Sequence, residues 1–363
     1  MKHINYWLLT FGGLALILAG VFLVVDVQRA PALAQDDEAP AEARDYIGAD
    51  ECQSCHRDLS RSHADSYHGR ALIEVGRNKD DILANFEVGE DVRTVQFPEE
   101  DAPRAFTVDD IAYVLGAGRY AQAYVYEIER GVYRVFPAKW NVTTQAWDAF
   151  TPADSWEDTA YDFVTQCAGC HTSGLDVERG RWLDDGVMCE SCHGPASEHE
   201  DVASDAGRRP NDEELVAIRA SINPGTDPQT CGACHSRGAV VEGVTAFSTT
   251  YRPGDTLTDS YVPFAADDTM HWYATGHAGH QNMQYNEWLV SGHPNALTAL
   301  KENDFKEDFC LNCHSQDAQY VSGLIARVEA GDRAGEAPAM PTVETAQYGV
   351  TCLSCHNPHF PAE

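Results

Sequence analysis

The sequence predicts a mainly α-helical protein with little regular secondary structure, to which a small β-hairpin insert and an N-terminal apolar helix are added. Three observations lead to this fold class. All twelve cysteines of the 363-residue chain lie in short Cys-x-x-Cys-His units that recur along its length. An apolar run covers residues 7–25. Aromatic and β-branched residues at 123–128 and 132–137 flank a short Gly-containing turn at 129–131, which is typical of a hairpin.

The six Cys-x-x-Cys-His units use every cysteine, and each unit has its histidine. In chain order they are Cys52, Cys55 and His56; Cys167, Cys170 and His171; Cys189, Cys192 and His193; Cys231, Cys234 and His235; Cys310, Cys313 and His314; and Cys352, Cys355 and His356. The two cysteines of such a unit form thioethers with a haem, and the histidine binds the iron as its proximal axial ligand. A disulfide framework, paired zinc sites or a thioredoxin-type centre fit the irregular spacing and sixfold recurrence less well. The sequence therefore predicts six covalently bound c-type haems, which replace the usual apolar core and keep the helices short.

Distal axial ligands come from the remaining histidines. Of fifteen histidines, six are proximal and His3 precedes the apolar run, so eight remain for six irons. The expected distal ligands are His68, His199, His293, His359, His277 and His280; His271 competes with the last two, and His63 is the weakest candidate. His359 is too close to its own unit to bind that iron, so we expect it at a neighbouring haem. If all six irons are bis-histidine, none has a vacant position for a substrate.

One short pattern occurs twice. Residues 66–72 and 291–297 both have the form Ser-x-His-x-x-Ala-Leu. The first follows a haem unit and the second precedes one, so they are not a tandem repeat. We expect two recurring helices, each carrying a distal ligand, His68 or His293.

Residues 1–34 are interpreted as an export segment, because haem is attached to these units on the outer side of bacterial membranes. The length of the apolar run fits a spanning helix of about 20 residues better than a signal-peptide core of roughly 7–15 residues. Ala32 and Ala34, however, have the small-x-small form of a cleavage site. A retained anchor is preferred over cleavage. With Lys2 inside, the body lies on the periplasmic side of the cytoplasmic membrane.

Four segments follow the export segment. Residues 35–46 are acidic and rich in Ala and Pro, as expected for a solvated linker. Residues 47–160 carry the first haem and the β-insert, 161–245 carry haems two to four, and 246–363 carry haems five and six.

The charge balance limits the partners. With 57 acidic and 25 basic residues, the formal net charge is −32. This field repels nucleic acid and favours basic partners, although acidity also serves simple solubility. The expected partners are other redox proteins, either cytochromes or a quinol-linked complex, with the membrane contacted through the apolar segment. An oligomer or filament also fits.

Several stretches resemble the multihaem cytochrome c superfamily, which includes the tetrahaem electron acceptor of hydroxylamine oxidoreductase. The resemblance rests on residues 46–48, 66–68, 186–195, 231–237 and 348–359. It implies a haem-stacked, mainly α-helical body with parallel and perpendicular haem pairs. In the family, the histidine of Gly-Pro-x-Ser-x-His is a distal ligand, which corresponds to His199 here.

The resemblance and the ligand supply lead to electron transfer as the expected function, without catalysis. The chain has no Cys-x-x-Cys-Lys unit, unlike the pentahaem nitrite reductases, and fewer units than the octahaem hydroxylamine-oxidising members. The alternative is a reductase or oxidase of a small nitrogen or sulfur compound with one open haem. A filament subunit, in which a spare histidine binds a haem of the next chain, is the third possibility.

Overall fold

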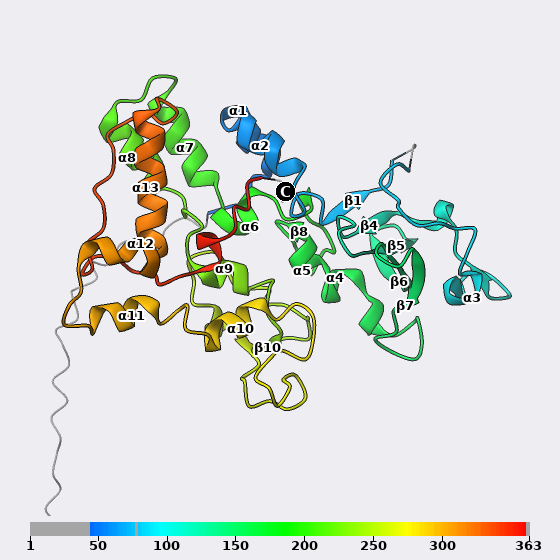
Figure 1. Cartoon of the computed structure of the whole chain (residues 1–363). Helices are drawn as coiled ribbons and strands as arrows, with labels where there is room; N and C mark the ends of the chain where they lie inside the picture. The colour runs from blue at the N-terminus through cyan, green and yellow to red at the C-terminus, as the bar shows by residue number, and fades with distance from the viewer. Residues whose placement is uncertain (1–43, 77–78, 361–363) are drawn as a thin grey trace, which may run out of the picture. The chain divides into compact units, whose positions relative to one another are not determined.

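The computed structural model describes residues 44–76 and 79–360, which belong to one compact unit (Figure 1). The predicted apolar helix within 1–34 and most of the predicted linker 35–46 lie outside the described residues. Within the described part of the chain, no helix is long and apolar enough to cross a membrane. Whether the N-terminal segment is an anchor or a cleaved signal stays a prediction.

The described helices are short and are joined by long loops. The longest, α13 (Gln316–Glu329), has 14 residues. The other α-helices are α1 (Ala49–Cys55), α2 (Arg57–Ala64), α3 (Glu90–Arg93), α4 (Phe163–Gln166), α5 (Ala168–His171), α6 (Cys189–His193), α7 (Ser197–Ala206), α8 (Asp212–Ala220), α9 (Pro228–Gly232), α10 (Gln284–Val290), α11 (Ala296–Lys301) and α12 (Leu311–His314). Single 3-10 turns are η1 (Val108–Asp110), η2 (Thr159–Tyr161), η3 (Leu257–Asp259), η4 (Asp308–Cys310) and η5 (Cys352–Ser354). Local capping helps to order them: the Asn211 side chain accepts from the Glu214 N–H and forms a capping box at the start of α8.

A five-stranded antiparallel sheet is the largest regular element. Its strand order is β1-β4-β5-β6-β7. The strands are β1 (Leu72–Glu74), β4 (Tyr113–Leu115), β5 (Ala121–Glu129), β6 (Val132–Asn141) and β7 (Ala146–Ala149). The predicted hairpin is confirmed as β5 and β6, and Gly131 supplies the positive φ of 81° that their turn requires. Three further pairs, β2 (Thr94–Val95) with β3 (Arg104–Ala105), β8 (Thr172–Ser173) with β9 (Asp184–Asp185), and β10 (Gly238–Val240) with β11 (Tyr261–Pro263), are two-stranded.

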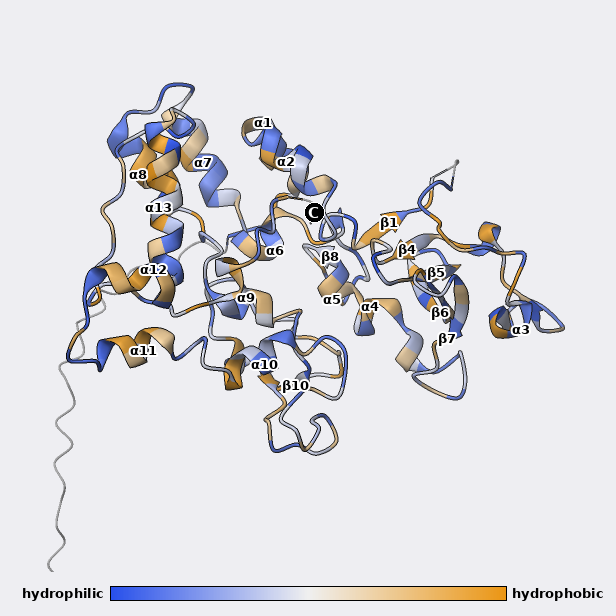
Figure 2. Ribbon diagram, viewed as in Figure 1, coloured by the Kyte–Doolittle hydropathy of each residue, from blue (hydrophilic) through white to orange (hydrophobic). Residues whose placement is uncertain are grey.

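Aromatic packing forms the core of this sheet. Phe106 and Phe136 are fully buried and stack with their ring centres 3.9 Å apart. Trp140 and Trp147, which are paired across β6 and β7, pack edge-on at 5.6 Å. In Figure 2 the hydrophobic colour is clear along β1 and β4. The sheet therefore has a conventional hydrophobic core, independent of any haem.

The fold class differs from the prediction in one respect. The chain is a mixed α and β structure, in which the expected hairpin is the centre of a five-stranded sheet. The difference arises because β1, β4 and β7 are only three or four residues long. Strands this short show too little alternation in the sequence to be recognised.

Candidate haem-binding sites

The six Cys-x-x-Cys-His units, called units 1 to 6 in chain order, lie on or beside single helical turns. Units 1, 2, 3, 4 and 5 lie at α1, α5, α6, α9 and α12, and unit 6 lies at η5. In units 1, 4 and 6 the histidine N–H donates to the carbonyl of the first cysteine, at 2.8, 2.8 and 2.9 Å. One helical turn places residues i, i+3 and i+4 on the same face. Both sulfurs and the imidazole of a unit therefore point to one side, as a covalently attached haem requires.

Backbone carbonyls fix the orientation of several of these histidines. The Nδ1 atoms of His171, His193 and His314 lie 2.9, 2.8 and 3.2 Å from the carbonyl oxygens of Ala71, Asn223 and Ala296. A carbonyl only accepts, so Nδ1 carries the proton and Nε2 is left free with its lone pair. This arrangement is typical of histidines that bind metal ions, because the hydrogen bond sets both the tautomer and the ring direction.

Three proximal histidines face a second histidine. The ring centres of His56 and His199 lie 6.3 Å apart, and their planes are 20° from parallel. His193 and His359 lie 6.1 Å apart at 22°. His235 and His68 lie 5.9 Å apart at 75°. Each pair joins residues that are far apart in the sequence.

These separations fit one iron atom between the two rings. A metal–imidazole bond of about 2 Å on each side, plus about 1 Å from each nitrogen to its ring centre, places the ring centres about 6 Å apart. Rings in direct stacking contact would be closer, as in the pair formed by Phe264 and His271 at 3.8 Å. The residues present therefore fit bis-histidine haems at units 1, 3 and 4.

Burial favours the neutral form of four of these imidazoles, those of His56, His68, His235 and His359. Desolvation, with smaller contributions from the neighbouring His235 and His63, lowers the pKa of His68 to about 4. Burial is also the main cause of the lowered pKa of His56 and of His359. A histidine must be neutral to bind a metal, so low pKa values leave these side chains ready as ligands at neutral pH.

Cysteines of different units touch each other. The thiol of Cys52 in unit 1 is hydrogen-bonded to Cys189 in unit 3, which raises the pKa of Cys52 and lowers that of Cys189. The same contact between Cys231 of unit 4 and Cys352 of unit 6 raises the pKa of Cys231 and lowers that of Cys352 to about 7.

A third contact joins unit 2 to unit 4. A hydrogen bond to Cys170 raises the pKa of Cys234 well above its usual value, and desolvation adds to the rise. Thioether formation removes the thiol protons, so in the haem-bearing protein these hydrogen bonds are absent. The contacts then indicate only which units lie close together. Units 1 and 3, 2 and 4, and 4 and 6 are neighbours.

Other predicted ligands have no proximal histidine opposite them. Among the described residues no ring pair includes His171, His314 or His356, or the predicted distal ligand His293. His293 is exposed. Its role as a ligand, with the roles of His277 and His280, stays a prediction.

The loop that precedes α10 contains His271, His277 and His280. The His277 side chain is 78% exposed, with Nδ1 3.7 Å from Glu287, and His280 Nε2 lies 3.1 Å from the Met270 carbonyl. His271 stacks on Phe264 and bonds to Asp268.

The expectation of helices at the two Ser-x-His segments was wrong. Residues 65–70 form turns, and His293 lies in a bend before α11. The His68 carbonyl accepts from Ala71 and from Val187, and the His293 carbonyl accepts from Ala296 and from Val350. These short-range and long-range bonds take the place of i to i+4 helix bonds, and Pro294 further disfavours a helical His293.

Sequence reasoning missed Glu190, which joins units 1 and 3. Its carboxylate is only 2% exposed and accepts from the backbone N–H groups of Ile47, Gly48 and Ala196 at 2.8 to 3.1 Å. Ala196 leads into α7, which carries His199. The signal available in the sequence was a charged residue between the two cysteines of a unit, because such a carboxylate needs partners where it is buried.

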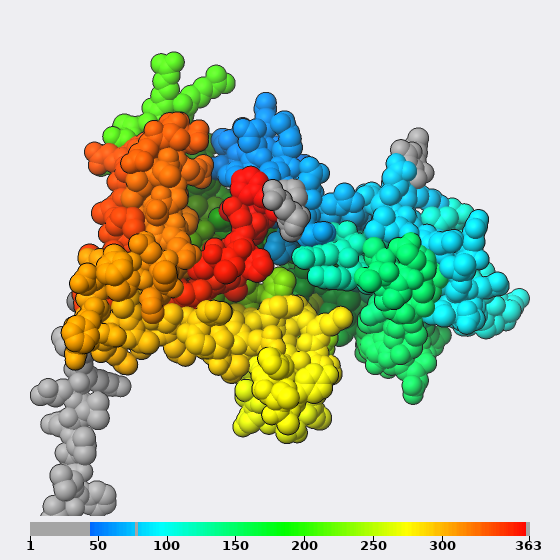
Figure 3. All heavy atoms as spheres, viewed as in Figure 1, coloured from blue at the N-terminus to red at the C-terminus, as the bar shows by residue number. Residues whose placement is uncertain are grey.

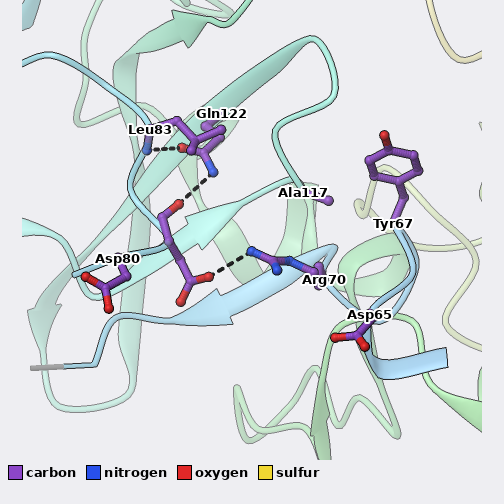
Figure 4. Close-up of a pocket in the computed structure, with 8 residues that line it drawn as sticks. Asp65, Tyr67, Arg70, Asp80, Leu83, Ala117 and Gln122 are labelled. Carbon is purple, nitrogen blue, oxygen red and sulfur yellow. Dashed lines mark hydrogen bonds and ion pairs between the residues drawn. The ribbon is translucent and has the colours of Figure 1, made fainter. Parts of the chain in front are cut away.

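A cavity of about 300 Å³ lies beside the 65–70 turns, between them and the sheet (Figure 4). Its polar groups bond to each other. Arg70 pairs with Asp81 at 2.8 Å, and the Gln122 amide bonds both to the Leu83 N–H and to the Asp81 carbonyl at 2.9 Å. These bonds hold the turn that carries His68 against the sheet.

Comparison with known proteins agrees with this chemistry. Residues 139–194 match the family model described as cytochrome c554 and c-prime, a stretch that includes units 2 and 3. The structure is similar to that of the outer cell wall cytochrome OcwA, with a TM-score of 0.65 and 27% identity over 87% of this chain and 63% of that chain. The undecahaem cytochrome from the S-layer of Carboxydothermus ferrireducens aligns with a TM-score of 0.45 and 18% identity, over 89% of this chain and 41% of that chain. A search of curated proteins gave no match.

The similarities and the units together indicate a multihaem c-type cytochrome with covalently bound haems. The resemblance to the cytochrome c554 and c-prime family is carried by 139–194, and the resemblance to OcwA by most of the described chain. The chain spans less than two thirds of the length of either solved structure.

Proposed function

We propose that the chain is an exported hexahaem c-type cytochrome that transfers electrons between redox partners through bis-histidine haems. The observation that carries the proposal is the set of facing histidines at units 1, 3 and 4, each separated by the space of one iron atom. Bound haem supplies reversible one-electron oxidation and reduction. The chain's own histidines would hold the iron from both sides at units 1, 3 and 4, and backbone carbonyls set the tautomers of His193 and His199.

The contacts between units support a conduit. Cysteine contacts link unit 1 to 3, 2 to 4 and 4 to 6, and α6 of unit 3 contacts α9 of unit 4. Five units are therefore joined in one connected network, which branches at unit 4. Unit 5 joins it through α13, which contacts both α12 and the η5 turn of unit 6. Groups that exchange electrons must be close neighbours, and this connectivity supplies a path across the protein.

The proposed location is outside the cytoplasm, with the N-terminal segment as an anchor on the periplasmic side of the cytoplasmic membrane. OcwA is described as an outer cell wall cytochrome, so the cell wall is the second location to test. The proposed partners are other redox proteins, either cytochromes or a quinol-linked complex, and the charge of −32 favours basic ones. Fractionation of cells into membrane, soluble and cell-wall parts, followed by haem staining, distinguishes the two locations.

A haem count and an axial-ligand census test the function. Pyridine haemochrome analysis should give six haems per chain. Low-temperature electron paramagnetic resonance should show low-spin bis-histidine signals from at least three of them. The H199A variant should add one high-spin haem per chain, whereas D201A, an exposed change on the same helix, should not. A protein whose haems are mostly high-spin would contradict the proposal.

A second function is favoured by one observation. Among the described residues, His171, His314 and His356 have no facing histidine, so one iron with an open position fits the geometry. An open haem is what a reductase or oxidase of a small nitrogen or sulfur compound needs. Carbon monoxide titration of the reduced protein separates the two functions. Binding of one carbon monoxide per chain supports the enzyme, and no binding supports the conduit.

A further inference from the structure

The chain contains one three-part arrangement twice. Module A consists of residues 66–72, unit 2 and the Gly-Val-x-Cys stretch that begins unit 3 at 186; module B consists of residues 291–297, unit 5 and the equivalent stretch that begins unit 6 at 349. In module A the Ala71 carbonyl accepts from His171 Nδ1, and in module B the Ala296 carbonyl accepts from His314 Nδ1. The same alanine of the Ser-x-His-x-x-Ala-Leu pattern therefore orients the first proximal histidine of each module.

The second link between the parts is also repeated. The Val187 N–H donates to the His68 carbonyl at 2.9 Å, and the Val350 N–H donates to the His293 carbonyl at 3.1 Å. A Cβ at the preceding glycine would meet the backbone of the Ser-x-His segment in both modules: at Gly186 it would lie 2.4 Å from the Gly69 oxygen, and at Gly349 2.7 Å from the Pro294 oxygen. His293 is thus the structural equivalent of His68.

In module A, the Ser-x-His histidine faces the proximal histidine of a haem unit outside the module. The His68 ring faces His235 of unit 4, and Cys234 of unit 4 contacts Cys170 of unit 2. The rule is that this histidine binds the iron of the unit that sits against the module's first unit. By this rule His293 binds the iron of neither unit 5 nor unit 6 of its own chain. It binds the iron of another unit that sits against unit 5.

In module B, no proximal histidine faces the equivalent histidine. Among residues 44–76 and 79–360 no ring pair includes His293 or His314, whereas His68 of module A faces His235. Phe305 is 90% exposed and Phe309 is 68% exposed, and both lie just before Cys310. Figure 3 shows this segment, in gold and orange, at the surface. Exposed aromatic side chains beside a histidine that has no facing histidine among the described residues indicate an interface.

We propose that a second copy of the chain covers this face, with His293 of each copy binding the iron of unit 5 in the other. The proposal rests on the proposed function, since it requires a haem on unit 5. The hydrogen bond from His314 Nδ1 to the Ala296 carbonyl holds two parts on one face: the segment that carries His293, which supplies the ligand, and unit 5, which receives one. A two-fold axis then completes both irons at once, and a self-complementary patch of this kind is the commonest way to form a dimer. Phe305 and Phe309 would be buried in the contact.

Charge makes the pairing depend on salt. Two chains of net charge −32 repel each other, and the repulsion between exposed charges is screened at raised ionic strength. The axial bonds and the aromatic contact are short-range and are screened much less. The dimer should therefore be favoured at about 0.5 M over about 0.05 M salt.

Sedimentation velocity of the haem-loaded full chain, combined with low-temperature spectroscopy, tests the proposal. The wild type should sediment as a dimer at raised salt. H293A should be a monomer and should gain one high-spin haem per chain. N295A, an exposed change in the same turn, should stay a dimer with an unchanged spectrum. F305D should weaken the dimer without touching a ligand, so it tests the interface even where H293A fails to mature.

Each outcome decides between the proposals. Six haems with low-spin signals in a wild type that is monomeric at all salt concentrations would overturn the dimer and leave the proposed function standing. So would a dimer that H293A leaves intact, open-ended filaments, or pairing only with a different cytochrome. A haem content well below six per chain would instead overturn the proposed function.

Discussion

Replacing Glu190 by glutamine tests how the first and third haem units are held together. The buried carboxylate accepts three backbone N–H groups, from Ile47, Gly48 and Ala196. The amide of glutamine has one acceptor oxygen, so its NH2 group must face at least one of these donors. Losing one charge-assisted hydrogen bond and leaving one buried N–H unpaired should together cost about 3 kcal/mol of unfolding free energy.

Guanidinium unfolding of the haem-loaded protein, followed by far-UV circular dichroism, measures this cost as a shift of the midpoint. The matched control is E198Q, because Glu198 is an exposed glutamate on α7 that pairs with Arg44. An exposed ion pair of this kind contributes at most about 1 kcal/mol. E190Q should also loosen α7 and raise the high-spin fraction at unit 1, where His199 faces His56. If E190Q unfolded within about 0.5 kcal/mol of the wild type, the carboxylate would not join the two units.

Three further outcomes are expected. G349A should lower the free energy of unfolding by about 1–3 kcal/mol, because its Cβ would lie 2.7 Å from the Pro294 carbonyl oxygen, whereas G292A, with open space around it, should not. Equal unfolding free energies for the two variants would refute the close approach. F136A should cost about 3–5 kcal/mol of unfolding free energy and leave the haem spectrum unchanged, since Phe136 lies in the sheet core. V132A, at the exposed end of the hairpin, is its control. A changed spectrum would show that the sheet core supports the haem ligands. In stopped-flow experiments, oxidation by a basic cytochrome should slow as salt increases, and oxidation by ferricyanide should speed up. The net charge of −32 attracts the basic cytochrome and repels the ferricyanide anion, and salt screens both effects. The same salt dependence for both oxidants would exclude electrostatic control.

Local patterns made part of the structure predictable. The hairpin of β5 and β6 was recognisable because its two long strands alternate and a Gly-containing turn joins them. The six units were recognisable because a single helical turn sets the spacing of the two cysteines and the histidine, which needs no tertiary information.

Long-range contacts set the limit of prediction. His68 faces His235 and His193 faces His359, and nothing near these residues in the sequence indicates which partner each has. The turns at the Ser-x-His segments were mistaken for helices because the Val187 and Val350 N–H groups, which bind the histidine carbonyls, come from distant parts of the chain. The short strand β1 is likewise visible only through its pairing with β4.

The position of the sheet within module A bears on how the protein could be rebuilt. The chain enters the sheet at Leu72 and leaves it for α4 at Phe163, and these two residues pack in one hydrophobic cluster. The Ala71 carbonyl just before this entry binds both the Gly116 N–H of the sheet and His171 of unit 2. The whole segment between is therefore an insertion with adjacent ends, a geometry that accepts exchange of one domain for another. No haem unit lies between these two ends in the sequence, so a binding domain of choice grafted at this junction would be carried beside unit 2.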